Sequence, residues 1–167
     1  MKTRGEMATY MRGSVARIGV KFDKPDDDWV ATLVASGSEG VRVYSLMPDL
    51  FEPGATKTGT WRWLPELVKK ENVRCLGLVM STWALKEDER KELRREKGPN
   101  ASFGDHPNAR EQVWIAAIDR VGEEFWIAEI VRREDAPPTL GKWERPDFDT
   151  IGGDAVSALR SILRGDS

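Results

Sequence analysis

His106 is the only histidine among the 167 residues, and Asp105 directly precedes it. A histidine beside a carboxylate supplies the residue types of a general base and of the group that orients it. Adjacent side chains seldom form that pair, however, so the acidic partners would have to come from elsewhere in the fold. One alternative for the chain is therefore a small hydrolase-like or nucleotide-processing enzyme that uses His106 with distant acids.

The candidate nucleophiles do not strengthen this alternative. Ser81, Ser102 and Cys75 all lie outside a Gly-x-Ser-x-Gly elbow, the turn that exposes an activated serine. A turn explains the histidine segment more simply, because Pro107 biases His106 toward an extended conformation. The sequence thus identifies no catalytic residue, and we expect a protein that is not an enzyme.

Residue types and spacing also argue against a bound metal or cofactor. One histidine and one cysteine cannot form a structural zinc site. The consecutive acids Asp26, Asp27 and Asp28 point in different directions and lack the spacing of a calcium-binding loop. The glycine patterns that hold phosphate groups do not occur in the sequence. We expect no metal and no cofactor.

The composition indicates an ordinary globular chain with a formal net charge of -2, 40% hydrophobic residues and 32% charged residues. This charge lacks the basic excess of a nucleic-acid-binding protein. A weak single-stranded nucleic-acid binder remains an alternative, because Trp114 and Trp126 lie in predicted strands near Arg132 and Arg133. A single cysteine in an apolar run, with no signal peptide and no membrane-length apolar stretch, predicts a cytoplasmic protein.

Alternating and continuous apolar runs predict the strands that must position these residues. The strand-like runs are 14–22, 29–35, 41–47, 73–81, 112–119 and 125–133. A short helix is expected to start near Pro65 and to end at Asn72, and an amphipathic helix is expected to close the chain. Residues 135–150 are predicted to be a proline-rich connection, since prolines exclude a central strand.

These elements predict an α+β fold with one domain and a mostly antiparallel sheet of about five to six strands. One short helix and the C-terminal helix pack on that sheet. We expect residues 1–13 to be a flexible N-terminus and residues 14–167 to form the domain. Within it, residues 84–107 form a charged excursion that is either a solvent-exposed helix or disordered.

The string VRCLGLVMSTW, a polar excursion and then DHPNAREQVWIAAID resemble a pattern in small uncharacterised proteins of bacteriophages and their bacterial hosts. In that pattern an apolar strand ends in Trp, and a His-Pro or Asp-Pro turn with an Arg-Glu pair leads into the next strand. The resemblance spans about residues 60–133 and implies this topology and a phage origin, but no activity. Ser81 and Thr82 stand where the pattern has an acid.

The first functional hypothesis is a non-enzymatic protein-interaction factor, encoded by a phage as an accessory or host-modulating protein. It rests on seven tryptophans, the charged excursion and the lack of a catalytic constellation. The expected contact residues are Trp83, His106, Arg110 and Glu111, which flank the excursion near one sheet edge. We expect a protein partner rather than a membrane or nucleic acid, and homo-oligomer formation is left open.

Overall fold

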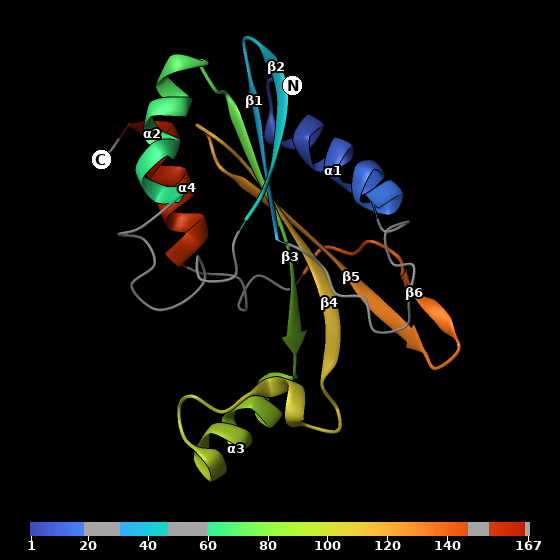
Figure 1. Cartoon of the computed structure of the whole chain (residues 1–167). Helices are drawn as coiled ribbons and strands as arrows, with labels where there is room; N and C mark the ends of the chain where they lie inside the picture. Colours follow the sequence, from blue (N-terminus) through green and yellow to red (C-terminus); the bar gives the residue numbers. More distant parts are fainter. Residues whose placement is uncertain (19–30, 47–59, 147–153, 166–167) are drawn as a thin grey trace.

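The computed structural model describes residues 1–18, 31–46, 60–146 and 154–165, which form a sheet with helices on both faces (Figure 1). Six strands pair antiparallel in the order β2-β1-β3-β4-β5-β6. They are β1 (Thr32–Gly37), β2 (Gly40–Ser45), β3 (Cys75–Ala84), β4 (Arg110–Asp119), β5 (Glu123–Arg133) and β6 (Ala136–Leu140). The predicted α+β class with a mostly antiparallel sheet is confirmed.

Of the six predicted strands, all except 14–22 correspond to strands of the structure, β1 to β5. β1 and β2 form a hairpin in which Gly40 has φ 111°, a backbone conformation that favours glycine. β3 and β4 are the two central strands, and the first five residues of β3 are buried. A continuous apolar run is typical of such a strand, because both of its faces are covered. The ends of the predicted strands at 29–30 and 47 lie outside the described residues.

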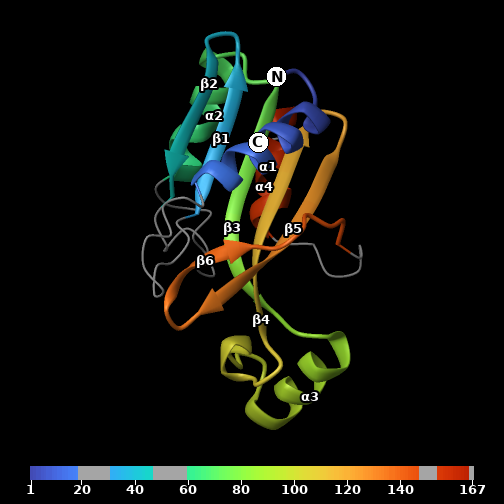
Figure 2. The same ribbon diagram turned by 90° about the vertical axis from the view of Figure 1, so that its right-hand side faces the viewer.

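The first helix, α1 (Arg4–Ile18), corrects the prediction for the N-terminus. We expected a flexible segment over residues 1–13 and a strand over 14–22, but residues 4–18 are helical. Residues 19–22 lie outside the described part. Met7 and Met11 are fully buried against β3, β4 and β5, and Figure 2 shows α1 running across that face of the sheet. The helix is therefore a structural layer.

Gly77 makes room for this helix. A Cβ on Gly77 would overlap the Met11 sulfur and would lie 2.8 Å from Met11 Cε and 3.2 Å from Met7 Sδ. The absence of a side chain at the centre of β3 thus lets two long methionines fill the space between helix and sheet. Methionine suits such a gap because its unbranched chain adapts to irregular shapes.

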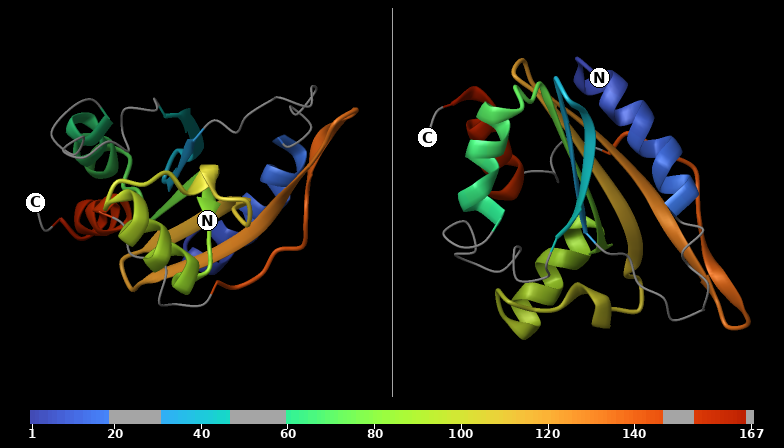
Figure 3. Two further views of the ribbon diagram at one scale, coloured as in Figure 1. Left: turned by 90° about the horizontal axis from the view of Figure 1, so that it is seen from below. Right: turned by 45° about the horizontal axis from the view of Figure 1, so that its top comes forward.

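The opposite face carries α2 (Thr60–Lys70) and α4 (Asp154–Arg164), so the molecule has three layers (Figure 3). Leu64 of α2 and Leu159 of α4 are buried in one cluster with Leu76 of β3, as the predicted short and C-terminal helices require. Pro65 lies inside α2, which begins at Thr60, so the helix starts earlier than the predicted position near Pro65. Asn72, with φ 47°, ends this segment as predicted.

Asp119 ties α1 to the β4–β5 hairpin. Its carboxylate accepts hydrogen bonds from the backbone N–H groups of Val121 (2.8 Å), Gly122 (2.9 Å) and Arg4 (3.0 Å). Burial alone would raise the pKa of Asp119, but these three donors and the Arg4 guanidinium outweigh it and lower the pKa below its ordinary value. A charged Asp119 therefore stabilises both the predicted hairpin and the start of the helix.

The proline-rich segment after β5 is a second correction. Residues 136–140, predicted to be part of a connection, form the edge strand β6. A register shift falls between Val131 and Arg133, beside the strand that contains Pro137 and Pro138. Proline has no N–H to donate to a ladder, so an edge position next to an irregularity is where it is tolerated.

The charged excursion is helical. It contains α3 (Glu87–Lys97) and a short 3₁₀ turn, η4 (Phe103–Asp105), beyond the ends of β3 and β4 (Figure 1). Leu85 and Leu93 are buried, and the Arg94 guanidinium lies 5.4 Å from the centre of the Phe103 ring. A few apolar contacts therefore hold a helix that is otherwise solvated. In the described part of the chain, every helix is too short or too polar to span a lipid bilayer.

Candidate functional site

Strand pairing brings most of the predicted contact residues together. Trp83 is the register partner of Glu111, and Ala84 is the partner of Arg110. They lie at the ends of the two central strands, beyond the residues that pair with β1 and β5, and so at one end of the sheet. β1 pairs with β3 only from Cys75 to Val79, and β5 pairs with β4 only from Gln112 to Ile118.

Glu111 and Arg110 differ in how accessible their side chains are to a ligand. Glu111 is buried and receives two hydrogen bonds from Arg132, Nε to Oε2 at 2.5 Å and Nη2 to Oε1 at 2.7 Å. A bidentate pair of this kind fixes two neighbouring strands, and it leaves little of Glu111 for a partner. Arg110 is exposed, and its nearest described carboxylate is Glu129 at 3.8 Å. Of the two residues, Arg110 remains free to contact a ligand.

His106 belongs to a turn. Its backbone is extended, with φ -85° and ψ 135°, as the following proline predicts. Its Nδ1 accepts a hydrogen bond from the backbone N–H of Asn108 at 3.1 Å, and the Asn108 amide donates to Glu89 Oε1 at 2.7 Å. The hydrogen bonds of the described residues join no carboxylate to His106. The arrangement anchors the turn to α3.

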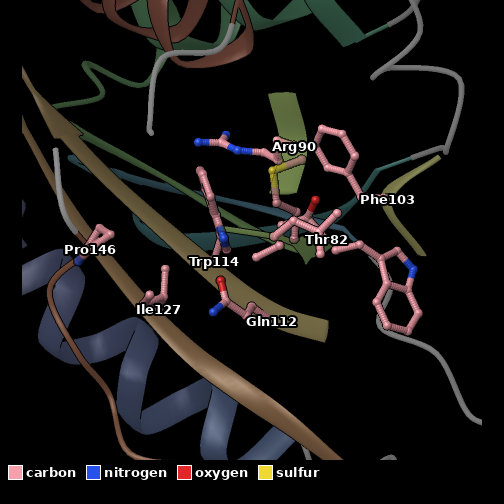
Figure 4. Close-up of a pocket in the computed structure, with 11 residues that line it drawn as sticks. Thr82, Arg90, Phe103, Gln112, Trp114, Ile127 and Pro146 are labelled. Atoms are coloured by element: carbon pink, nitrogen blue, oxygen red, sulfur yellow. The ribbon is translucent and has the colours of Figure 1, made fainter. Parts of the chain in front are cut away.

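A cavity of about 360 Å³ lies between the end of the sheet and the excursion (Figure 4). This volume is at the lower end of the range for small-ligand sites. Its lining is mainly apolar and includes three aromatic rings. The lining residues are Met80, Thr82, Trp83, Ala84, Leu85, Arg90, Phe103, Gln112, Trp114, Ile127 and Pro146. We call it the aromatic pocket; His106 does not line it.

The polar groups of the aromatic pocket are mostly donors. Arg90 is the one charged side chain among its lining residues. The Trp114 Nε1–H is buried and has no hydrogen-bond partner in the described part of the chain. Figure 4 shows the Arg90 guanidinium extending toward the Trp114 side and the Gln112 amide pointing toward the indole. A buried donor without a partner is costly, so an acceptor supplied by a ligand would be favourable.

Arg90 is only loosely engaged by the protein. Its guanidinium lies 3.4 Å from Glu87 Oε2, whereas the Lys91 ammonium lies 2.9 Å from Glu87 Oε1. The hydrogen bond from Lys91 is also the main reason why the pKa of Glu87 is lowered. Lys91 can therefore neutralise Glu87 while Arg90 turns to a ligand.

Trp83 forms the rim of the aromatic pocket and is 46% exposed. Its ring packs on Gly104 of η4, where an added Cβ would lie 3.0 Å from Trp83 Nε1. The close approach of η4 thus orients the ring at the mouth. Sequence reasoning found Trp83, but it missed Arg90, Phe103 and Gln112.

A second cavity of about 660 Å³ adjoins the aromatic pocket and shares Ala84, Leu85 and Gln112 with it. Its charged lining residues are Lys86, Glu89 and Arg110. Glu89 is already bound, since one oxygen accepts from Asn108 and the other from the Lys86 backbone N–H. We call this cavity the basic groove, because Lys86 and Arg110 give its lining a net positive charge.

The tryptophans proposed for stacking nucleic-acid bases do not share a surface. Trp114 lines the aromatic pocket, whereas Trp126 packs with the cluster under α1 on the opposite face. Arg12 and Arg145 lie over the Trp126 ring, at 3.9 and 4.6 Å from its centre. These contacts use Trp126 for packing, so the two indoles offer no common platform.

Cys75 is free and buried, as predicted for a small apolar residue. Burial, assisted by the charge of Asp119, raises its pKa to about 11, which suppresses the reactive thiolate. Among the described residues, the side chains of His, Cys, Asp and Glu form no group of three that is suited to a metal ion.

No protein-family model, curated protein or solved structure matches this chain. The geometry of the two cavities therefore carries the functional argument.

Proposed function

We propose that this protein is a non-enzymatic, cytoplasmic interaction factor that binds a segment of a partner protein at the aromatic pocket. The observation that carries the proposal is the pocket itself. Its apolar centre, the exposed Trp83 at its mouth and the charged excursion around it match the anatomy of a protein interface, which has an apolar core and a polar rim. Tryptophan and arginine are also the residues that most often dominate binding energy.

The neighbouring basic groove favours a peptide over an isolated small molecule. The two cavities share three lining residues, so an extended chain can enter one and continue along the other. The single charged side chain in the aromatic pocket, Arg90, is not a general acid or base at neutral pH. The site thus has the chemistry of recognition, and the phage origin remains a separate prediction.

The test is a selection from random peptide libraries that present either a free C-terminus or an internal segment. We expect the wild-type protein to enrich related peptides. Thr82→Phe, which fills the aromatic pocket from β3, should lose them. Val43→Phe adds the same ring at an exposed position of β2, where Val43 is 52% exposed, and should retain them.

Two outcomes would oppose the proposal. If no related peptides are enriched in either library, the protein does not recognise peptides. If Thr82→Phe binds the enriched peptides as well as Val43→Phe does, recognition takes place elsewhere. Circular dichroism of both variants establishes that the added ring leaves the fold intact.

A further inference from the structure

The polar groups of the aromatic pocket are complementary to a ligand that contains hydrogen-bond acceptors. Arg90 and the Trp114 Nε1–H can only donate, and no carboxylate is among the residues that line the pocket. The walls are apolar or aromatic, including Met80, Phe103 and Ile127. The complementary ligand therefore has an apolar body and an anionic or acceptor head placed near Arg90 and Trp114.

The basic groove extends this requirement to the neighbouring part of the ligand. Lys86 and Arg110 are exposed there, and the Glu89 carboxylate of the same cavity is bound by Asn108 and by a backbone N–H. An acidic side chain next to the apolar body would meet this positive balance. Complementary charge of this kind contributes mainly to specificity and to the association rate.

We infer that the aromatic pocket binds the C-terminal residue of a partner protein, with its apolar side chain between the rings and its α-carboxylate on Arg90 and the Trp114 N–H. An acidic residue just before the C-terminus lies in the basic groove. This inference rests on the proposed function and specifies the chemistry of the partner. Capture of a terminal carboxylate is an established mode of peptide recognition.

The test is calorimetric titration with short acetylated peptides that have Glu next to last and Phe, Trp, Leu, Ile or Met last. Each peptide is used as the free acid and as the C-terminal amide. We expect the best free acid to bind at least about tenfold more tightly than its amide, because the carboxylate makes charge-assisted hydrogen bonds.

Arg90→Gln should reduce this ratio to about one and leave binding of the amide nearly unchanged. Arg95→Gln is the matched control, since it removes the same charge from an exposed residue of α3 that does not line the aromatic pocket. It should leave the ratio as in the wild type. Trp114→Phe keeps a ring and removes the N–H, so it should weaken the acid more than the amide.

Equal binding of acids and amides overturns the inference. If internal peptides are then still selected in a Thr82-dependent way, the proposed function stands alone. An equal effect of Arg95→Gln and Arg90→Gln also overturns it, because general charge attraction would then explain the preference. If 3-phenylpropionate binds as tightly as the best peptide, the ligand is a small acid and the peptide partner is wrong. Failure of all peptides in both experiments removes both proposals.

Discussion

Substituting Gly77 tests the placement of α1, the layer that the sequence did not predict. In Gly77→Ala the new Cβ would overlap the Met11 sulfur and approach Met11 Cε at 2.8 Å. Both Met7 and Met11 are fully buried, so the Met11 side chain cannot move away from the new methyl group into solvent without exposing apolar surface. Overpacking of this kind costs about 1–3 kcal/mol of unfolding free energy.

A double-mutant cycle with Met11→Ala isolates the contact. On its own, Met11→Ala should cost about 2–5 kcal/mol, because it opens a cavity under the helix. In the Gly77→Ala background the added methyl group occupies part of that space, so the same truncation should cost less. We expect a coupling energy of about 1–2 kcal/mol, measured by urea unfolding followed through tryptophan fluorescence.

Gly13→Ala is the control on the same helix. Gly13 is exposed and a Cβ there meets no atom within 4 Å, so the substitution should stabilise the protein by about 0.5–1 kcal/mol through helix propensity. If Gly77→Ala and Met11→Ala are additive to within about 0.5 kcal/mol, α1 does not lie over Gly77. A destabilising Gly13→Ala would contradict the helix at that position.

Three further predictions concern buried polar and titratable groups. With a pKa of about 11, the Cys75 thiol should resist an aromatic disulfide reagent at about pH 8 until urea unfolds the chain; rapid labelling of the native protein would contradict its burial. Arg132→Met should lower the free energy of unfolding by about 1–3 kcal/mol, because it leaves the buried Glu111 carboxylate without its ion-pair partner. The loss is smaller than for a fully buried pair because Arg132 is partly exposed to solvent. Adding Glu111→Gln should recover part of that loss in urea unfolding, and no recovery would refute the pairing. The lowered pKa of Asp119 stabilises the fold above about pH 4, and this contribution is lost as the pH falls through the folded-state pKa. The difference in unfolding free energy between wild type and Asp119→Asn should therefore shrink toward acid pH, and a constant difference would exclude the effect.

The central strands were predictable because burial on both faces requires apolar residues at successive positions of the sequence. In 112–119, Val113, Ile115 and Ala117 alternate with Trp114 and Ala116, so apolar residues occupy both faces of the strand. The structure puts the first three under α1 and Ala116 under the opposite helices. A strand covered on one side alone would show polar residues at every second position.

The N-terminal helix left no comparable mark. Its buried residues, Met7, Ala8 and Met11, follow helical spacing, but they are few and stand among polar residues and glycines. Methionine and alanine are weaker apolar signals than the branched residues 15, 18 and 20, which suggested a strand instead. The space that receives this helix is created by Gly77, about sixty residues further along the chain, and local periodicity carries no information about it.

The residues of the candidate site were also hard to predict from local sequence patterns. His106 drew attention because it is unique, but rarity of a residue type says nothing about where its side chain lies. The aromatic pocket needs Arg90 from α3, Phe103 from η4 and Trp114 from β4 to converge, and the sequence of α3 has the pattern of a solvated charge run. Leu93 within α3 and Leu85 just before it are buried, but a charge run alone does not indicate which arginine of the helix faces the pocket. Of the five basic residues in α3, Arg90 alone lines it, and for that reason its substitution, rather than that of any neighbouring charge, should separate binding of a free carboxylate from binding of its amide.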